Sequence, residues 1–189
     1  MISPGILLGA YSIGYFPMAD SDGSISWYSP DPRTIIPLDN CSVPRSTKQL
    51  IKKKIFRIEI DKNFEAVMRG CAGREETWIS EEIIESYIRL HRLGYAHSVE
   101  SIDSEGLAGG LYGVALGSAF FGESMFSYRS GSSKVALAFL IDHLKEKGFK
   151  LLDIQYITPH LQMFGATEIS RKNYLDLLRH AMEEKVDFV

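Results

Sequence analysis

Three strand-forming segments follow one another with only short turns between them, and no other feature constrains the fold as strongly. They cover residues 97–102, 107–116 and 119–124, and the turns lie at 103–106 and 117–118. Short turns rich in Gly, Asp and Ser return each strand alongside the one before it. The sequence therefore predicts an antiparallel meander, in which the glycines of the second strand allow close approach of neighbouring backbones.

The segments after the meander predict a change in strand direction. Residues 133–147 keep a helical pattern that ends at Gly148, and residues 150–155 form a short apolar strand. Strand–helix–strand order favours parallel pairing, so we expect an α+β fold with a mixed sheet flanked by helices. Further helices are expected at 4–12, 46–53, 63–69, 80–93 and 171–184, with another strand at 56–60.

Proline suggests a division of the chain. Five of the seven prolines lie within residues 17–44. Because Pro fixes φ and biases the preceding residue away from the helix, this segment is expected to be irregular and extended. We therefore expect a small N-terminal portion at residues 1–44 and a main domain at residues 45–189.

Composition excludes several classes of protein. With 45% hydrophobic and 24% charged residues, the chain is typical of globular domains and unlike disordered or fibrous chains. No segment approaches the ~20 apolar residues of a membrane-spanning helix, and no basic segment precedes the apolar residues 6–10, so we expect a cytoplasmic protein. Cys41 and Cys71 are widely spaced and the histidines form no ligand motif, which argues against a disulfide or a metal site.

The net charge of −3 by itself argues against a nucleic-acid partner. Its distribution reverses that argument, because six cations and no acid lie between residues 45 and 57, which leaves −9 for the rest of the chain. A local cationic patch can attract and hold phosphate groups. The alternative is an ordinary solvated helix face. The six cations are Arg45, Lys48, Lys52, Lys53, Lys54 and Arg57.

Aromatic side chains offer a second candidate for nucleic-acid contact. Trp27 and Tyr28 stand in a loop stiffened by proline, and Trp78 lies between Thr77 and Ile79. Each ring could stack on a base. The alternative is that each ring anchors its loop to the core.

Two strand ends carry polar residues in apolar surroundings. Glu123 is flanked by phenylalanines and Met125, which would desolvate its carboxyl and raise the pKa. The alternative is a solvated strand-end glutamate.

Asp153 and Gln155 are two residues apart in a strand, so they are expected to share one face. Burying both without partners is costly, which suggests a polar site. The alternative is that this face is simply exposed to water.

Taken in this order, the motifs resemble the leucyl/phenylalanyl-tRNA–protein transferases of bacteria over nearly the whole chain. The most specific are W-x-S-P-D-P-R at residues 27–33 and G-E-S-M-F-S at residues 122–127. The main domain of that family resembles the acetyltransferase (GNAT-like) fold, which is built around a mixed, split sheet. Further matching segments lie at residues 9–17, 45–46, 77–79, 87–98, 109–114, 133–134, 153–155 and 165–166.

The resemblance implies a reaction. Leu or Phe, with Met as a third candidate, would pass from the 3′ ester of aminoacyl-tRNA to the α-amino group of proteins that begin with Lys or Arg, marking them for N-end-rule degradation. The ester is already activated, so no ATP, CoA or metal is expected. We expect the protein to act as a monomer.

The resemblance also implies roles for individual residues. Gln155 would orient the reacting amine through its carbonyl oxygen, Asp153 would hold Gln155 or the substrate cation, and Glu123 would help to bind the acceptor's first residue. Trp78, Tyr28 and Trp27 would hold the terminal adenosine. The aminoacyl side-chain pocket would be lined by Leu111, Phe120, Ser124, Leu137, Ala138 and Leu140, and the tRNA backbone would contact Arg45, Lys48, Lys52 and Lys53.

Two other functions fit parts of this pattern. The first is a CoA-dependent N-acyltransferase of the same fold, which would need a Q/R-x-x-G-x-G/A loop before a helix. The nearest match, residues 162–167, fails at its last position and follows the wrong strand, so CoA binding is not expected. The second is a non-catalytic RNA-binding module, which would bind RNA but transfer no amino acid.

Overall fold

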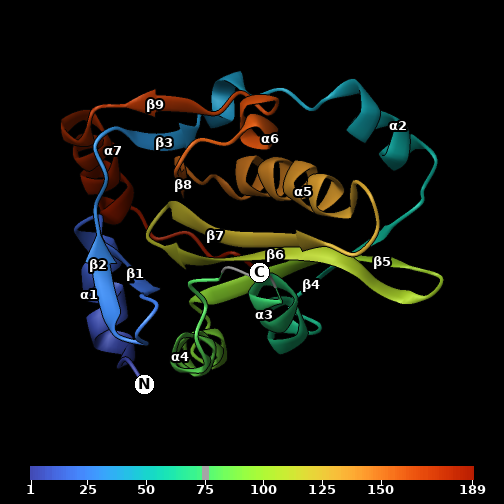
Figure 1. Ribbon diagram of the computed structural model, residues 1–189. Coiled ribbons are helices and arrows are strands. Elements are labelled where there is room, and N and C mark those ends of the chain that lie inside the picture. The colour runs from blue at the N-terminus through green and yellow to red at the C-terminus, as the bar shows by residue number, and fades with distance from the viewer. Residues whose placement is uncertain (74–76) are drawn as a thin grey trace.

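A seven-stranded mixed sheet forms the centre of the computed structural model, which describes residues 1–73 and 77–189 (Figure 1). The strand order is β4-β5-β6-β7-β8-β3-β9, and β7 and β8 form its parallel pair. The other pairs are antiparallel. The strands are β3 (Arg33–Ile36), β4 (Arg57–Ile60), β5 (Ala96–Asp103), β6 (Gly106–Leu116), β7 (Ala119–Ser127), β8 (Leu151–Gln155) and β9 (Thr167–Ile169).

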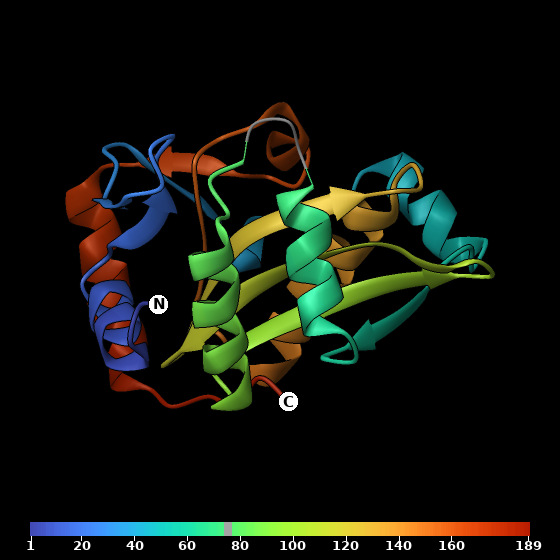
Figure 2. The same ribbon diagram turned by 60° about the horizontal axis from the view of Figure 1, so that its bottom comes forward.

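Helices cover both faces of this sheet. In Figures 1 and 2, α3 (Phe64–Ala72) and α4 (Glu81–Arg92) lie on one face and α5 (Ser132–Lys147) lies on the other. The helices α1 (Pro4–Ser12) and α7 (Arg171–Glu183) stand together at one end of the sheet. The short helices η1 (Leu38–Asn40), α2 (Arg45–Lys52) and α6 (Pro159–Gln162) lie on the side of α5.

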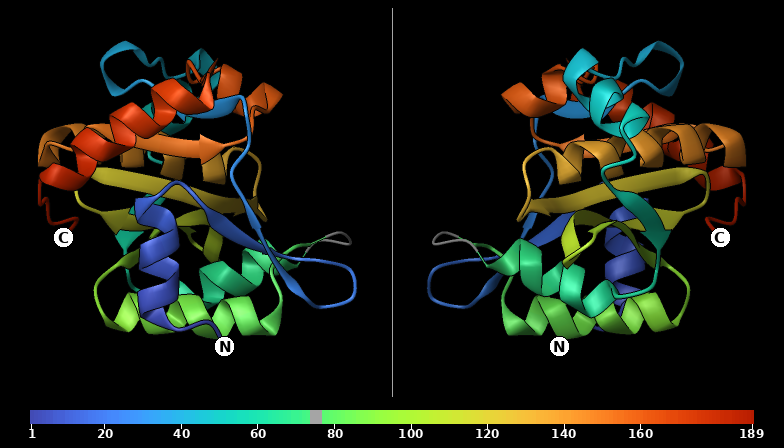
Figure 3. Two further views of the ribbon diagram at one scale, coloured as in Figure 1. Left: turned by 90° about the vertical axis from the view of Figure 1, so that its left-hand side faces the viewer. Right: turned by 90° about the vertical axis from the view of Figure 1, so that its right-hand side faces the viewer.

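A separate two-stranded sheet lies beside the main one. It pairs β1 (Phe16–Ala19) with β2 (Ile25–Tyr28) and projects next to α1 (Figure 3). The backbone N–H of Ala19 donates to the carbonyl of Trp78 at 3.0 Å, which ties the hairpin to the segment before α4.

Local chemistry explains where several elements begin and end. The hydroxyls of Ser3 and Ser80 accept N–H bonds from Ile6 and Ile83, each at 3.3 Å, and so cap α1 and α4. Gly148 ends α5 in the left-handed conformation. At Gly109 in β6, an added Cβ would lie 2.7 Å from the carbonyl oxygen of Phe126, so close strand approach requires glycine there.

The predicted α+β fold, meander and mixed sheet are confirmed. The segment expected to be irregular differs, because it contains β1, β2 and β3. Although β3 belongs to the proposed N-terminal portion, it pairs with β8 and β9 inside the main sheet. The division at residue 44 stays a prediction. Within the described residues, no helix is both long and apolar enough to cross a membrane.

Candidate active site

Two β-bulges shape the region where β7 and β8 meet. Between β6 and β7 the register passes from Gly113↔Gly122 to Tyr112↔Ser124, which leaves Glu123 as an extra residue. Between β3 and β8 it passes from Ile35↔Asp153 to Thr34↔Gln155, which leaves Ile154 extra. A bulge re-aims side chains and bends its strand, and bulges occur often beside active sites. Here the extra residues are Glu123 itself and Ile154, which lies between Asp153 and Gln155.

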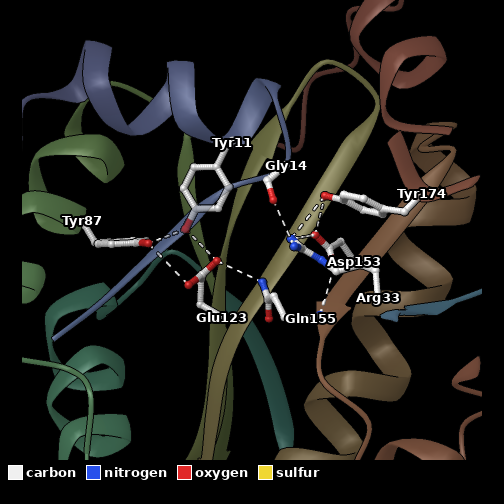
Figure 4. A network of polar contacts seen from close by, with 8 residues as sticks. All are labelled: Tyr11, Gly14, Arg33, Tyr87, Glu123, Asp153, Gln155 and Tyr174. Carbon is white, nitrogen blue, oxygen red and sulfur yellow. Dashed lines mark hydrogen bonds and ion pairs between the residues drawn. The ribbon is translucent and has the colours of Figure 1, made fainter. Parts of the chain in front are cut away.

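Asp153 forms a fully buried ion pair with Arg33 (Figure 4). Arg33 donates from Nε to Oδ1 at 2.9 Å and from Nη2 to Oδ2 at 2.6 Å, and both side chains are 0% exposed. Tyr174 adds a bond from its hydroxyl to Oδ2 at 2.8 Å. Arg33 also donates to the carbonyl of Gly14 at 3.0 Å, and its guanidinium lies over the rings of Phe16 and Tyr174. The carboxylate is therefore already neutralised from within the protein.

Gln155 ends β8 in a strained backbone conformation. Its φ is 58°, in the left-handed region that residues with a Cβ rarely adopt, and its backbone N–H donates to Asp153 Oδ1 at 3.0 Å. The side-chain Nε2 donates to Glu123 Oε1 at 3.3 Å. Asp153 thus holds the backbone of Gln155, while Glu123 orients its amide so that the amide oxygen points away from Glu123 (Figure 4).

Glu123 accepts hydrogen bonds from two buried tyrosines. The hydroxyl of Tyr11 donates to Oε1 at 2.7 Å and that of Tyr87 to Oε2 at 3.4 Å, and the two hydroxyls also contact each other. Burial raises the pKa of Glu123 to about 8, despite these donors. Burial also raises the pKa of both tyrosines, so their hydroxyls stay protonated. At neutral pH the Glu123 carboxyl is therefore mostly protonated.

The structure confirms the predicted desolvation of Glu123. It brings Asp153 and Gln155 into one polar network, although the bulge at Ile154 interrupts the alternation from which their shared face was predicted. Asp153 and Gln155 are 0% and 6% exposed, so the alternative of a solvent-facing strand is wrong. The solvated-glutamate alternative is also wrong, because Glu123 is only partly exposed and accepts hydrogen bonds from Tyr11 and Tyr87.

An apolar cavity of about 90 Å³ is lined by residues of β6, β7, α5, β8 and α6, with Glu123 among them. Four of the six predicted pocket residues line it, namely Leu111, Ser124, Leu137 and Leu140. The other two, Phe120 and Ala138, are buried in the same apolar cluster without lining the cavity. The remaining lining residues are Tyr112, Gly122, Glu123, Met125, Leu152, Ile154 and Leu161.

A wider cleft of about 300 Å³ adjoins this cavity, and the two share five lining residues, namely Glu123, Ser124, Met125, Ile154 and Leu161. Gln155 lines the cleft, and so does Trp78, which lies there with Phe16 and Met18. Tyr28 does not line the cleft, but its ring stacks on that of Phe16, with 6.1 Å between the ring centroids. Trp27 is on the same hairpin and is 37% exposed.

The basic cluster lies apart from these cavities, on α2. Arg45, Lys48 and Lys52 occur at helical spacing along one face, Lys53 directly follows the helix, and all four side chains are exposed. The helix packs against the beginning of α5, where Leu50 contacts Gly131. This exposure fits both interpretations of the cluster, phosphate contact and a solvated face.

The sequence analysis assigned no role to four residues of this network, Arg33, Tyr11, Tyr87 and Tyr174. The first three lie in segments that match the family, at residues 27–33, 9–17 and 87–98. One signal could have found the ion pair. The segments R-T-I-I at 33–36 and L-L-D-I-Q at 151–155 each carry one charge in an apolar strand, and a buried charge needs an opposite partner. Two further residues of the W-x-S-P-D-P-R motif contact the start of α7, because the Asp31 carboxylate accepts from the backbone N–H of Arg171 and the Ser29 carbonyl accepts from its guanidinium.

No group of three or more His, Cys, Asp or Glu side chains is placed to hold a metal ion within residues 1–73 and 77–189. The candidate site is therefore built from one carboxyl, one amide, one buried ion pair and apolar walls.

Comparison with known proteins shows close relatives of this chain. A leucyl/phenylalanyl-tRNA protein transferase from Chlorobaculum tepidum is 50% identical over the full length of both chains. One from Rubrobacter xylanophilus is 50% identical and covers 96% of this chain and 95% of its own. Among solved structures, L-PGS from Bacillus licheniformis is 13% identical with a TM-score of 0.45, over 81% of this chain and 50% of its own.

Two family profiles cover most of the chain. One, described as leucyl/phenylalanyl-tRNA protein transferase, matches residues 35–179, and the other, described as the N-terminal domain of that enzyme, matches residues 1–31. Together with the two relatives, these matches show that the chain belongs to the leucyl/phenylalanyl-tRNA protein transferase family.

Proposed function

We infer that this protein transfers leucine or phenylalanine from aminoacyl-tRNA to the N-terminal amino group of proteins that begin with Lys or Arg, which would mark them for degradation. Membership of the family supports the reaction. The observation in the structure that supports it is the apolar cavity, which suits an aliphatic or aromatic side chain and is lined in part by Glu123, the hydrogen-bond partner of Gln155. Met is a third candidate for the transferred amino acid.

The chemistry needs one bond to form and one to break. The neutral α-amine attacks the ester carbonyl, a C–N bond forms, and the C–O bond to the 3′ oxygen of the adenosine breaks as that oxygen takes a proton. Free α-amino groups have a pKa of ~7.7–8.0, so much of the acceptor is neutral near pH 8. We propose that Gln155 accepts an N–H bond from the amine through its amide oxygen, which aligns the nitrogen lone pair with the ester.

Asp153 acts in this proposal by positioning Gln155. Both of its oxygens already bind Arg33, which disfavours a role in holding the cation of the substrate. Glu123 fits that role better, because it is the one acidic side chain that lines the cavities among the described residues. A nearby Lys or Arg side chain would favour the ionised form of Glu123.

We further propose that transfer needs no ATP, CoA or metal, because the aminoacyl ester is already activated. The main sheet fits the expected GNAT-like architecture, since β7 and β8 pair only from Ala119↔Leu151 to Phe121↔Asp153 and then separate. We place the protein in the cytoplasm, where charged tRNA is found, and expect it to act as a monomer with two sequence-defined portions divided near residue 44.

Lys48→Ala is expected to weaken binding of aminoacyl-tRNA and to reduce the slope of log affinity against log salt by about one. The physical reason is that each phosphate contact releases condensed counterions. Titration of labelled tRNA across a salt series measures both quantities. Lys147→Ala is the matched control, because Lys147 is exposed at the opposite end of α5. An unchanged slope in Lys48→Ala would remove that contact from the interface.

A transfer assay tests the proposed function directly. The protein is incubated with tRNA charged with labelled Leu, Phe or Met and with a peptide that begins with Arg. We expect label on the peptide with Leu and Phe, and none on the same peptide when its N-terminus is acetylated. RNA binding without transfer would indicate a binding module, and acylation that requires CoA would indicate the related acyltransferase chemistry.

A further inference from the structure

One of the hydrogen bonds to the Asp153 carboxylate comes from a helix outside the sheet (Figure 4). Arg33 in β3 donates to both carboxylate oxygens, and the backbone N–H of Gln155 in β8 donates to Oδ1. Tyr174, near the start of α7, donates from its hydroxyl to Oδ2 at 2.8 Å. Tyr174 therefore connects α7 to a carboxylate whose other donors belong to the sheet.

The Tyr174 side chain has little room to move. It is 0% exposed, and the guanidinium of Arg33 lies 4.4 Å from the centroid of its ring. A Cβ added to Gly14, just after α1, would lie 3.0 Å from Tyr174 Cε1, so the ring packs closely against that backbone. Burial raises the pKa of Tyr174, which keeps its hydroxyl protonated and able to donate.

The start of α7 is itself held in place. The hydroxyl of Ser170 caps the helix by accepting from the N–H of Asn173 at 3.2 Å, and the N–H of Arg171 donates to Asp31 at 3.0 Å. Asp31 lies two residues before Arg33 in the chain. The loop and the helix together therefore place both donors to Asp153 Oδ2.

The backbone of Gln155 depends on this carboxylate. Its φ of 58° costs free energy, and such a conformation persists where the surrounding structure enforces it. The hydrogen bond from its N–H to Asp153 Oδ1, at 3.0 Å, is part of that enforcement. Loss of the Tyr174 bond would leave Oδ2 with its Arg33 contact alone, and the carboxylate would hold Gln155 less firmly.

We propose that Tyr174 is a positioning residue for aminoacyl transfer, whose hydroxyl fixes the Asp153 carboxylate and so keeps the Gln155 amide aimed at the acceptor amine. The proposal rests on the proposed function, in which Gln155 aligns that amine. Tyr174 lines neither the apolar cavity nor the wider cleft, so it acts through Asp153 and not by contact with substrate. A small displacement of an orienting group is enough to slow a reaction that depends on alignment.

Tyr174→Phe tests the proposal, because it removes the hydroxyl and keeps the ring beside Arg33. We expect kcat for transfer to an Arg-starting peptide to fall at least ~10-fold, while the acceptor KM and the Kd for aminoacyl-tRNA stay within about twofold of the wild type. A purely structural role would lower stability and leave kcat of the folded variant unchanged. An unchanged kcat, or a rise in KM alone, would overturn the proposal.

A second variant shows whether Tyr174 acts through Gln155. Adding Tyr174→Phe to Gln155→Ala should slow the residual transfer by less than about twofold, because the group that Tyr174 positions is then absent. A further ~10-fold loss in the double variant would mean that Tyr174 acts independently of Gln155, and would overturn the proposal.

Leu178→Ala is the matched control on the same helix. Leu178 is 1% exposed and lies one turn further along α7, so its truncation leaves a cavity and lowers stability without removing a bond to Asp153. Its kcat should match that of the wild type at a temperature at which circular dichroism shows all variants to be folded. An equal loss of kcat in Leu178→Ala would assign the effect to helix packing and overturn the proposal. Failure of the wild type to label the peptide would instead overturn the proposed function.

Discussion

Replacing Asp153 by alanine is expected to reduce turnover at least ~100-fold and to lower the free energy of unfolding by about 3–5 kcal/mol. Turnover falls because the backbone N–H of Gln155 loses its acceptor and the amide is no longer held toward the amine. Stability falls because Arg33, which is 0% exposed, is left as an unpaired buried charge. Denaturant unfolding and single-turnover transfer to an Arg-starting peptide measure the two effects.

A double variant separates stability from chemistry. Replacing a buried ion pair by apolar residues of similar size is often neutral for stability. Arg33→Met combined with Asp153→Leu should therefore recover most of the lost stability but little of the lost turnover. Turnover like that of the wild type in this folded double variant would show that Asp153 has no part in the reaction.

Patterns that depend on neighbouring residues were predictable from the sequence. The meander and the long helices were found because short turns, caps and hydrophobic spacing act locally. The strand β3 was not found, since it has four residues among prolines and exists because β8 and β9 pair with it from both sides. The end of β7 was placed too early for a related reason, because pairing with Gly109 extends it to Ser127.

The site was predictable in part. Strand periodicity predicts that Asp153 and Gln155 belong to one site, and the apolar neighbours of Glu123 predict its raised pKa. The partners of these groups come from distant parts of the chain, such as Arg33 for Asp153 and Tyr11 for Glu123. The register shifts that aim Glu123 and Gln155 at each other are tertiary features, which single-strand patterns do not encode.

Replacing Glu123 by glutamine is expected to remove a pH dependence of stability worth about 3–5 kcal/mol, since each unit of pKa shift corresponds to ~1.4 kcal/mol. Burial raises the pKa of Glu123 from 4.5 to about 8 in the folded protein. Glutamine is neutral at every pH and keeps an oxygen that can accept from Tyr11. The quantity to measure is the difference in unfolding free energy between variant and wild type, from urea titrations across pH at fixed ionic strength.

The sign of this difference follows from proton binding. Between pH 4.5 and about pH 8 the folded state holds a proton on Glu123 that the unfolded state has lost, so raising the pH destabilises the folded wild type. Below pH 4.5 both states are protonated, and above about pH 8 both are ionised, so the slope vanishes there. The unfolding free energy of the variant should therefore rise relative to that of the wild type as pH rises through this window. Glu168→Gln, at an exposed position on β9, should show no such trend. A difference that stays flat with pH would mean that Glu123 is ionised in the folded site, and the cationic side chain of the acceptor would then meet a charge that is already present.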